Sequence, residues 1–213
     1  MTDAVLYVDA EPARSVGELL AAAARDGQTI VLTGGSSVGR AYETAAELEP
    51  DWSEASVWWG DERSNYLLAK RTLLDRLERE PDVHRIRGEL QPADAAGTYE
   101  KALEGVELDL LLLGLGPDAH IASLFPGSPQ LEERERLVTS GPAGLKPFVD
   151  RVTLTLPALL SARRIVFLVA GADKAEAVRR AFREEISDDA PASLLRRGSV
   201  PIDVFLDAAA SGG

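Results

Sequence analysis

The feature that most constrains the fold is a short apolar run followed by glycine or small polar residues and then by a helical pattern. This arrangement occurs four times, with the apolar runs at 29–33, 56–59, 108–113 and 164–170. Runs such as DLLLLG and IVFLVAG do not alternate apolar with polar residues, which is typical of parallel strands covered on both faces. The repeated order of strand and helix predicts an α/β fold with a single doubly wound, mostly parallel sheet and helices on both faces, a Rossmann-like architecture.

Weaker signals extend this pattern along the rest of the chain. Ser15 is expected to cap a helix that stops at Gly27. Pro92 is expected to lie in the first turn of a helix that Gly105 closes. The remaining expected elements are strands at 5–8, 151–155 and 202–206 and a long irregular loop at 127–150.

Composition narrows the classes of function. The chain has 35 acidic and 23 basic residues, and its formal net charge of -12 disfavours nucleic acid and anionic membranes as partners. Cysteine is absent and only two histidines occur, so a cysteine-ligated or histidine-rich metal site is not expected. No apolar run approaches about 20 residues, and the first residues lack a signal-peptide pattern, so we expect a cytoplasmic protein. We also expect it to be monomeric or weakly dimeric, with residues 1–213 in one domain.

The run TGGSSVG follows the first strong strand and precedes a helix. Gly34 and Gly35 allow a tight turn, and Ser36 and Ser37 place hydroxyl groups beside the free amides of a helix N-terminus, which bind anions readily. The alternative is an ordinary strand-to-helix turn capped by serine. The segment fits neither the GxGxxG nor the P-loop pattern.

The run GDERSNY follows the second strand. Asp61, Glu62 and Arg63 offer carboxylates and a guanidinium group that can hold an oxyanion or a phosphate. The alternative is a solvated charge cluster, with Ser64 or Asn65 capping the next helix.

The two remaining strand ends carry a histidine and a lysine. His120 lies in GLGPDAHIASLFPG, where Asp118 can orient its imidazole for proton transfer near neutral pH. Lys174 lies in GADKAEAV at a helix start, where a cation is unfavourable unless an anion binds nearby, and lysine is rare in a chain with 19 arginines and four lysines. His84, in VHRIRGE, is expected to be structural.

Taken together, these segments resemble the 6-phosphogluconolactonase family, which is grouped with the glucosamine-6-phosphate deaminases in one superfamily. The resemblance extends from about Thr29 to Asp207, and its most specific part is GLGPDAHIASLFPG, in which SLFPG separates the lactonase pattern from the deaminase pattern. The supporting runs are LTGGSS, WWGDER, SNY, VHRIRGE, RVTLTLPALLSAR and VAGADKAEA.

Two positions depart from the family pattern. The glycine that the family has before the histidine is Ala119 here, so the turn is expected to avoid a conformation that only glycine tolerates. The family usually separates DER from SNY by a short loop, whereas Ser64 follows Arg63 directly here, either because the loop is deleted or because DERSNY corresponds partly to its far side.

The resemblance implies hydrolysis of 6-phospho-D-glucono-1,5-lactone to 6-phosphogluconate in the oxidative pentose phosphate pathway. His120 would take a proton from the attacking water, and Arg63 or backbone amides would hold the charge that develops on the carbonyl oxygen. Ser36, the amides of 35–37 and Lys174 would anchor the phosphate. The implied partner is thus a small phosphosugar lactone, with no metal or cofactor.

Two other functions remain open from the sequence. A sugar-phosphate deaminase or isomerase of the same fold would use the same phosphate anchors and a carboxylate base, for which Asp61 is the candidate. A non-catalytic sugar-phosphate-binding protein is the other alternative, suggested by Ala119 and by the shortened loop.

Overall fold

The computed structural model describes residues 2–61, 63–143 and 150–212, apart from the side chains of Arg63 and Ser64. Within this part of the chain, seven strands form one parallel sheet. In their order across the sheet, the strands are β1 (Val5–Val8), β9 (Ile202–Leu206), β8 (Arg164–Val169), β5 (Leu110–Leu113), β2 (Thr29–Leu32), β3 (Ser56–Trp59) and β4 (Asp82–Val83). The four strong strand predictions and the weaker strand predictions at 5–8 and 202–206 are therefore confirmed.

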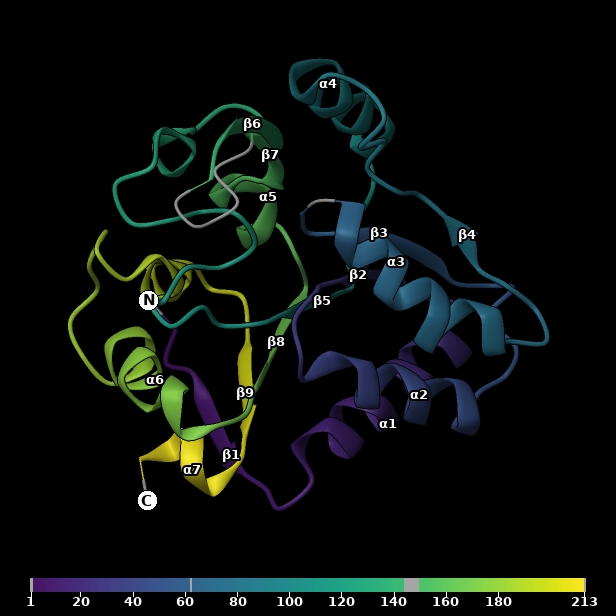
Figure 1. The fold of residues 1–213 in the computed structure, drawn as a ribbon, viewed down its shortest axis with the longest axis horizontal. Helices are drawn as coiled ribbons and strands as arrows, with labels where there is room; N and C mark the ends of the chain where they lie inside the picture. The colour runs from purple at the N-terminus through teal and green to yellow at the C-terminus, as the bar shows by residue number, and fades with distance from the viewer. Residues whose placement is uncertain (1, 62, 144–149, 213) are drawn as a thin grey trace.

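Helices cover both faces of the sheet, as Figure 1 shows. One face carries α1 (Pro12–Arg25), α2 (Val38–Leu48), α3 (Arg63–Thr72) and the short η1 (Leu74–Arg76). The other carries α4 (Pro92–Leu103), α5 (Leu156–Leu160), α6 (Ala175–Phe182), η4 (Pro191–Arg197) and α7 (Ala208–Ser211). The predicted doubly wound α/β architecture is confirmed.

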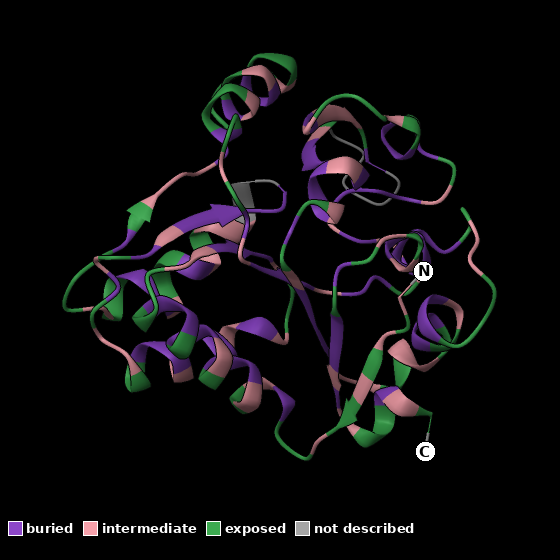
Figure 2. Cartoon of the chain, turned by 180° about the vertical axis from the view of Figure 1, so that it is seen from behind, coloured by how far each residue is buried: buried purple, intermediate pink, exposed green. Residues whose placement is uncertain are grey.

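The apolar runs face two cores because successive strand side chains point to opposite sides. In β5, Leu110 and Leu112 pack with α1, α2 and α3, whereas Leu111 and Leu113 pack with the helices of the other face. In β2, Ile30 and Leu32 likewise pack in the core on the side of α1, whereas Val31 packs in the core on the other side of the sheet. The central strands are buried along their length (Figure 2), which explains why their sequences lack polar alternation.

A hairpin lies outside the main sheet, over the same face as α4 and α5 (Figure 1). Its strands are β6 (Val138–Pro142) and β7 (Asp150–Leu154), paired antiparallel. β7 matches the strand expected at 151–155, whereas β6 and the short η2 (Pro129–Glu132) lie where a long irregular loop was expected. The prediction missed β6 because its sequence, VTSGP, ends in two residues that are poor strand formers.

Two local predictions about helix starts were wrong. α1 begins at Pro12 rather than at a Ser15 cap, and the Ser15 hydroxyl instead donates to Asp9 Oδ2 at 2.5 Å. Pro12 has a fixed backbone angle that suits the first helical position, so the helix starts one turn earlier. Asn65 likewise does not cap α3, because this helix already begins at Arg63. The start of α4 at Pro92 is confirmed.

The strand order creates a crevice at the carboxyl edge of the sheet. β2 lies between β3 and β5. The connection that follows β2 leads to β3 on one side, and the later strand β5 pairs with β2 on the other side. Ligands of open α/β sheets bind at such a switch point. Among the described helices, none combines the length and the apolar character that crossing a bilayer requires.

Candidate active site

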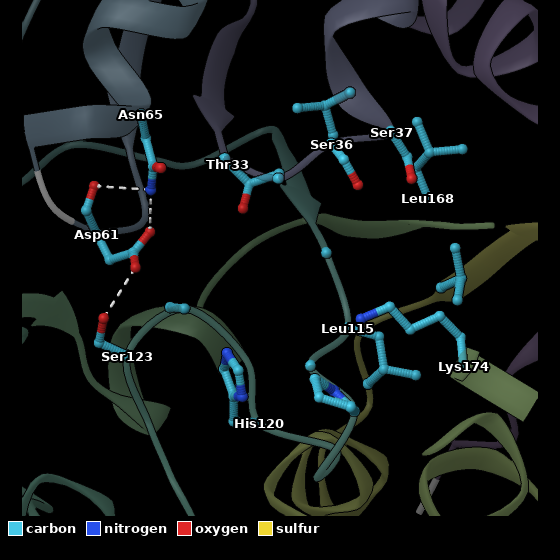
Figure 3. Close-up of a pocket in the computed structure, with 18 of the residues that line it drawn as sticks. Thr33, Ser36, Ser37, Asp61, Asn65, Leu115, His120, Ser123, Leu168 and Lys174 are labelled. Atoms are coloured by element: carbon cyan, nitrogen blue, oxygen red, sulfur yellow. Dashed lines mark hydrogen bonds between the residues drawn. The ribbon is translucent and has the colours of Figure 1, made fainter. Parts of the chain in front are cut away.

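A cavity of about 310 Å³ opens at the carboxyl ends of β2, β3, β5 and β8. The four polar segments expected at these strand ends all contribute to its wall. The residues of those segments that line it are Thr33, Gly34, Gly35, Ser36, Ser37, Val38, Asp61, Asn65, Gly114, Leu115, Gly116, Pro117, His120, Ala122, Ser123, Phe125 and Lys174. Figure 3 shows that their side chains come from widely separated parts of the chain.

His120 lies in the turn after β5 with its ring toward the cavity (Figure 3). Its Nδ1 lies 2.5 Å from Asp118 Oδ1, which also accepts the backbone N–H of His120 at 3.2 Å. Because an ionised carboxylate only accepts hydrogen bonds, this contact places the proton of a neutral ring on Nδ1 and leaves the lone pair on Nε2. Phe125 packs against the ring at 4.5 Å between centroids. The imidazole is therefore oriented as a proton acceptor.

The backbone around His120 adopts a left-handed conformation at two alanines. Ala119 has φ of 63° and Ala122 has φ of 47°. The expectation that Ala119 avoids a conformation favoured by glycine was thus wrong. Ala119 is fully buried, and hydrogen bonds from its N–H to Gly116 O and from Ala192 N to its carbonyl hold the turn in place. Surrounding structure therefore enforces a conformation that alanine alone would disfavour.

Asp61 follows β3 and is buried, with 7 % of its surface exposed. Its Oδ1 accepts a hydrogen bond from Asn65 Nδ2 at 2.5 Å, and its Oδ2 accepts one from the Ser123 hydroxyl at 2.8 Å (Figure 3). Ser123 is itself held by Thr153 of β7, whose Oγ1 accepts the Ser123 backbone N–H at 3.1 Å. Three segments far apart in sequence therefore meet at one carboxylate.

The glycine–serine loop forms the wall of the cavity next to α2. Gly35 has φ of 117°, a conformation that side chains disfavour, so this glycine is required by the turn. Gly34 is required for a different reason, because a Cβ there would lie 1.8 Å from Asn65 Oδ1. Ser37 precedes α2 without capping it through its side chain, which leaves the helix N-terminus facing the cavity.

Lys174 reaches the cavity from the opposite side to Asp61 (Figure 3). It ends η3 (Ala172–Lys174) just before α6, after a turn in which Gly171 has φ of 103°. Its side chain is 23 % exposed, and Asp173 lies 3.7 Å from its ammonium group. Arg151 of β7 also lines the cavity. Among the described residues, Lys174 and Arg151 thus bring positive charge to this pocket, in a chain whose net charge is -12.

Comparison with known proteins gives the family. Residues 8–203 match the model of a family described as glucosamine-6-phosphate isomerases/6-phosphogluconolactonase. The chain belongs to this family. Curated relatives include a protein of Streptomyces coelicolor named 6-phosphogluconolactonase, 36 % identical over 98 % of this chain and 91 % of its own. A human 6-phosphogluconolactonase is 37 % identical over 89 % of this chain and 82 % of its own.

The fold of the family extends over the whole chain. The crystal structure of 6-phosphogluconolactonase from Leishmania guyanensis superposes with a TM-score of 0.85 at 26 % identity, covering 100 % of this chain and 99 % of the other. The resemblance recognised from GLGPDAHIASLFPG and its companion runs is therefore confirmed.

Seven of the residues predicted for the site line this family pocket: Gly34, Gly35, Ser36, Ser37, Asp61, His120 and Lys174. Asn65, Ser123 and Arg151 were not predicted as site residues, although they lie within the recognised runs SNY, SLFPG and RVTLTLP. Asp118 does not line the cavity and instead contacts His120. The Arg63 side chain lies outside the description, as does Glu62 altogether.

The described part of this family member contains no cluster of three or more histidine, aspartate or glutamate side chains suited to hold a metal ion. Among the described residues that line the cavity, His120 is the one histidine, and Asp118 holds its ring. The pocket therefore offers an oriented imidazole, a fixed carboxylate and cationic side chains for its chemistry.

Proposed function

We infer that the chain hydrolyses 6-phospho-D-glucono-1,5-lactone to 6-phospho-D-gluconate, the lactonase step of the oxidative pentose phosphate pathway. The observation that carries this inference is the His120–Asp118 pair in a cavity that also holds Lys174. A phosphorylated lactone needs this combination of a proton acceptor for water and a cation for the phosphate. Relatives at 36 % and 37 % identity are named for this activity.

In the proposed reaction, Nε2 of His120 takes a proton from a water molecule as the water oxygen attacks C1 of the lactone. The bond between C1 and the ring oxygen then breaks, and the imidazolium returns the proton to that oxygen. Asp118 keeps the ring in the required tautomer and stabilises the imidazolium. The lactone is an activated ester, so one general base and a site for the oxyanion suffice.

The negative charge that develops on the carbonyl oxygen needs hydrogen-bond donors. We assign this role to Arg63, which opens α3 two residues after Asp61, or to backbone amides of the glycine turns after β5. Asp61 contributes a fixed carboxylate to the wall of the cavity. Donors placed in advance stabilise a transition state without reorganisation at the moment of reaction.

The phosphate is proposed to bind on the side of the cavity formed by the glycine–serine loop and Lys174. Ser36, the amides of 35–37 and the N-terminus of α2 supply hydrogen bonds and a favourable dipole. Lys174 supplies the cation, and Arg151 adds a second positive charge that the sequence analysis did not include.

The same cavity in a sugar-phosphate deaminase would need a carboxylate that abstracts a proton, and Asp61 was the candidate. In this chain Asp61 already accepts hydrogen bonds from both Asn65 and Ser123, which favours a fixed acceptor over a base. This geometry and the names of the relatives both favour the lactonase.

A coupled assay tests the proposal by following disappearance of the lactone against its spontaneous hydrolysis. The expected result is enzyme-dependent hydrolysis and no release of ammonia from glucosamine 6-phosphate. Ammonia release without lactone hydrolysis would overturn the proposal in favour of the deaminase, and binding of 6-phosphogluconate without either reaction would indicate a non-catalytic binding protein.

A further inference from the structure

The wall of the cavity contains a backbone donor, the N–H of Ala122, that the described protein groups leave unused. Ala122 lies two residues after His120, is half-buried and lines the cavity. The N–H of His120 donates to Asp118 Oδ1 at 3.2 Å. The N–H of Ser123 donates to Thr153 Oγ1 at 3.1 Å. Among the contacts of the described residues, the N–H of Ala122 has no acceptor. Because polar backbone groups in folded proteins are nearly always paired, a donor left over at a cavity points to a ligand.

A hydrogen bond within the turn fixes the direction of this N–H. The carbonyl of Ile121 accepts the N–H of Leu124 at 2.8 Å, so it points into the turn formed by residues 121–124. Ala122 supplies the nitrogen of the same peptide group as that carbonyl. Since the N–H and the C=O of a trans peptide group point in opposite directions, the N–H of Ala122 points out of the turn. It is therefore directed toward groups outside the turn.

The backbone at Ala122 is strained and held in place by its surroundings. Its φ of 47° lies in the left-handed region, which a residue with a side chain disfavours. Ser123 anchors the next peptide group, because its N–H bonds to Thr153 and its hydroxyl donates to Asp61 Oδ2 at 2.8 Å. Strained backbone persists where the surrounding structure enforces it, and such positions are concentrated at active sites. The donor is thus fixed before any ligand binds.

We propose that the N–H of Ala122 donates a hydrogen bond to the exocyclic oxygen on C1 of the lactone, where negative charge develops. This proposal rests on the function proposed above and names one donor for the oxyanion. A donor that is already oriented stabilises the transition state without reorganisation. His120 and Ala122 then act from one turn, His120 on the attacking water and Ala122 on the oxygen that gains charge.

The proposed step balances without a further reactant. When the water oxygen attacks C1, an electron pair of the carbonyl moves to the exocyclic oxygen, and Nε2 of His120 takes the proton of the water. When that electron pair returns, the bond between C1 and the ring oxygen breaks, and the imidazolium gives its proton to the ring oxygen. The N–H of Ala122 keeps its proton throughout.

The direct test replaces the amide N–H by an ester oxygen. L-Lactic acid introduced in place of Ala122 keeps the methyl group and removes the donor. The expected kcat is lower by about 10²- to 10³-fold, the usual effect of removing one oxyanion donor. Affinity for 1,5-anhydro-D-glucitol 6-phosphate, which carries no oxygen on C1, should not change. A kcat equal to that of the wild type would overturn the proposal.

The matched control is an ester at Leu124. An ester at Ala122 also makes the carbonyl of Ile121 a poorer acceptor, which weakens the hydrogen bond of the turn. L-Leucic acid in place of Leu124 removes the donor of that same hydrogen bond and leaves the N–H of Ala122 intact. This ester should retain most of the kcat. If both esters lower kcat equally, weakening of the turn explains the loss, and the proposal is wrong.

A second measurement uses the wild-type chain and does not depend on the folding of a variant. The chain is labelled with isotopic alanine, and the amide proton of Ala122 is followed by nuclear magnetic resonance during titration with two ligands. The first, 6-phospho-D-glucono-1,5-lactam, has the exocyclic oxygen and resists hydrolysis, whereas 1,5-anhydro-D-glucitol 6-phosphate lacks that oxygen. A new hydrogen bond moves an amide proton downfield, so the lactam should cause the larger downfield shift. Equal shifts would overturn the proposal.

Lactone hydrolysis is measured on the same wild-type preparation, so the two proposals can fail separately. A larger shift with the lactam but no hydrolysis supports the contact of Ala122 and overturns the lactonase. Hydrolysis by the wild type with an unchanged kcat in the Ala122 ester keeps the lactonase, overturns the role of Ala122 and moves the oxyanion site to Arg63.

Discussion

At the scale of single residues, the turn that carries His120 combines strain with close packing. Ala119 and Ala122 both have positive φ, a conformation that costs a residue with a side chain on the order of 1–3 kcal/mol. Gly116 approaches the imidazole so closely that a Cβ would lie 2.0 Å from Nδ1 of His120. The turn therefore constrains the ring from the backbone as well as through Asp118.

The strain at Ala119 predicts the effect of two substitutions. Ala119→Gly relieves the strain but removes a buried methyl group and adds flexibility to the unfolded chain, so its free energy of unfolding should change by less than about 1 kcal/mol. Ala119→Val adds a branched side chain at a buried position with φ of 63°, so the loss should exceed about 2 kcal/mol. Urea denaturation checks both, and equal stabilities would contradict the account.

The close approach of Gly116 to the imidazole predicts that Gly116→Ala lowers activity, although it changes no reacting group. The Cβ in Gly116→Ala should displace the imidazole and break its 2.5 Å contact with Asp118, which lowers kcat by about 10²-fold, a typical penalty for a misplaced catalytic group. Gly97→Ala is the control, because a Cβ at Gly97 meets nothing within 4 Å. Steady-state kinetics on both variants decides the matter, and unchanged kcat in Gly116→Ala would contradict the positioning of His120.

The site residues that could be predicted from the sequence are those of rare residue types at strand ends. His120 and Lys174 follow strand ends, and each is rare in this composition. Asn65 and Ser123 do not stand out, because their role depends on a contact with Asp61 that spans 62 positions in the case of Ser123. Local patterns do not reveal such a contact, and only the pairing of β7 with the end of β3 brings its partners together.

At the scale of elements, Glu100 connects α4 to the hairpin. Its carboxylate accepts hydrogen bonds from Arg136, at 2.7 Å for the nearer nitrogen, and from the backbone N–H of Leu137 at 2.9 Å. Burial raises the pKa of Glu100, but the hydrogen bonds from Arg136, Leu137 and Val138 together outweigh burial, so its pKa lies below the ordinary value. The folded state therefore favours the ionised form.

The contacts of Glu100 with the hairpin predict that the free energy of unfolding depends on pH. Because the folded pKa of Glu100 is depressed, its contribution is present above the unfolded pKa of 4.5 and is lost as the pH falls through the folded pKa. Glu100→Gln should lower the free energy of unfolding by about 1–2 kcal/mol near pH 7, with a smaller difference below pH of about 4. Chemical denaturation across this range provides the measurement.

The control for this element is Glu107→Gln. Glu107 pairs with Arg163 at the surface, and its side chain is 74 % exposed, so its replacement should change the free energy of unfolding by at most about 1 kcal/mol. A Glu100→Gln difference that stays constant from pH 7 to pH 3 would show that the carboxylate does not link α4 to the hairpin.

Strands could be predicted from the sequence where their burial in the core requires a run of apolar residues. Strands with two buried faces leave long apolar runs, which explains why β2, β3, β5 and β8 were found from the sequence. β4 was missed because it has only two residues, Asp82 and Val83, and pairs with β3 at the edge of the sheet. Ser15 was misassigned because both Ser15 and Pro12 are plausible helix starts, and only the tertiary structure selects one.

At the scale of the whole molecule, a chain with net charge -12 must attract a substrate that is itself an anion. The strand order solves this problem by gathering the ends of β2 and β8 at one edge, where Lys174 faces the glycine–serine loop. The positive charge that the described residues bring to this pocket is therefore local and comes from Lys174 and Arg151.

This arrangement predicts that Lys174 determines the preference for a phosphorylated substrate. Lys174→Ala should weaken binding by about 1.5–3 kcal/mol and remove most of the preference for phosphorylated over unphosphorylated gluconolactone. Lys70→Ala is the matched control, because Lys70 on α3 pairs with Asp75 on η1 and does not line the cavity. The specificity constants for both lactones provide the measurement, and an unchanged preference in Lys174→Ala would shift the phosphate site to Arg63 or Arg151.

The central claim is that this cavity hydrolyses the phosphorylated lactone with His120 as the general base. The most direct measurement compares enzyme-dependent lactone hydrolysis by the wild-type chain and by His120→Ala, after subtraction of spontaneous hydrolysis. The account predicts clear hydrolysis by the wild type and a kcat lower by about 10² to 10⁴ in the variant, with nearly unchanged affinity for 6-phosphogluconate. A folded His120→Ala variant with a kcat near that of the wild type would contradict it.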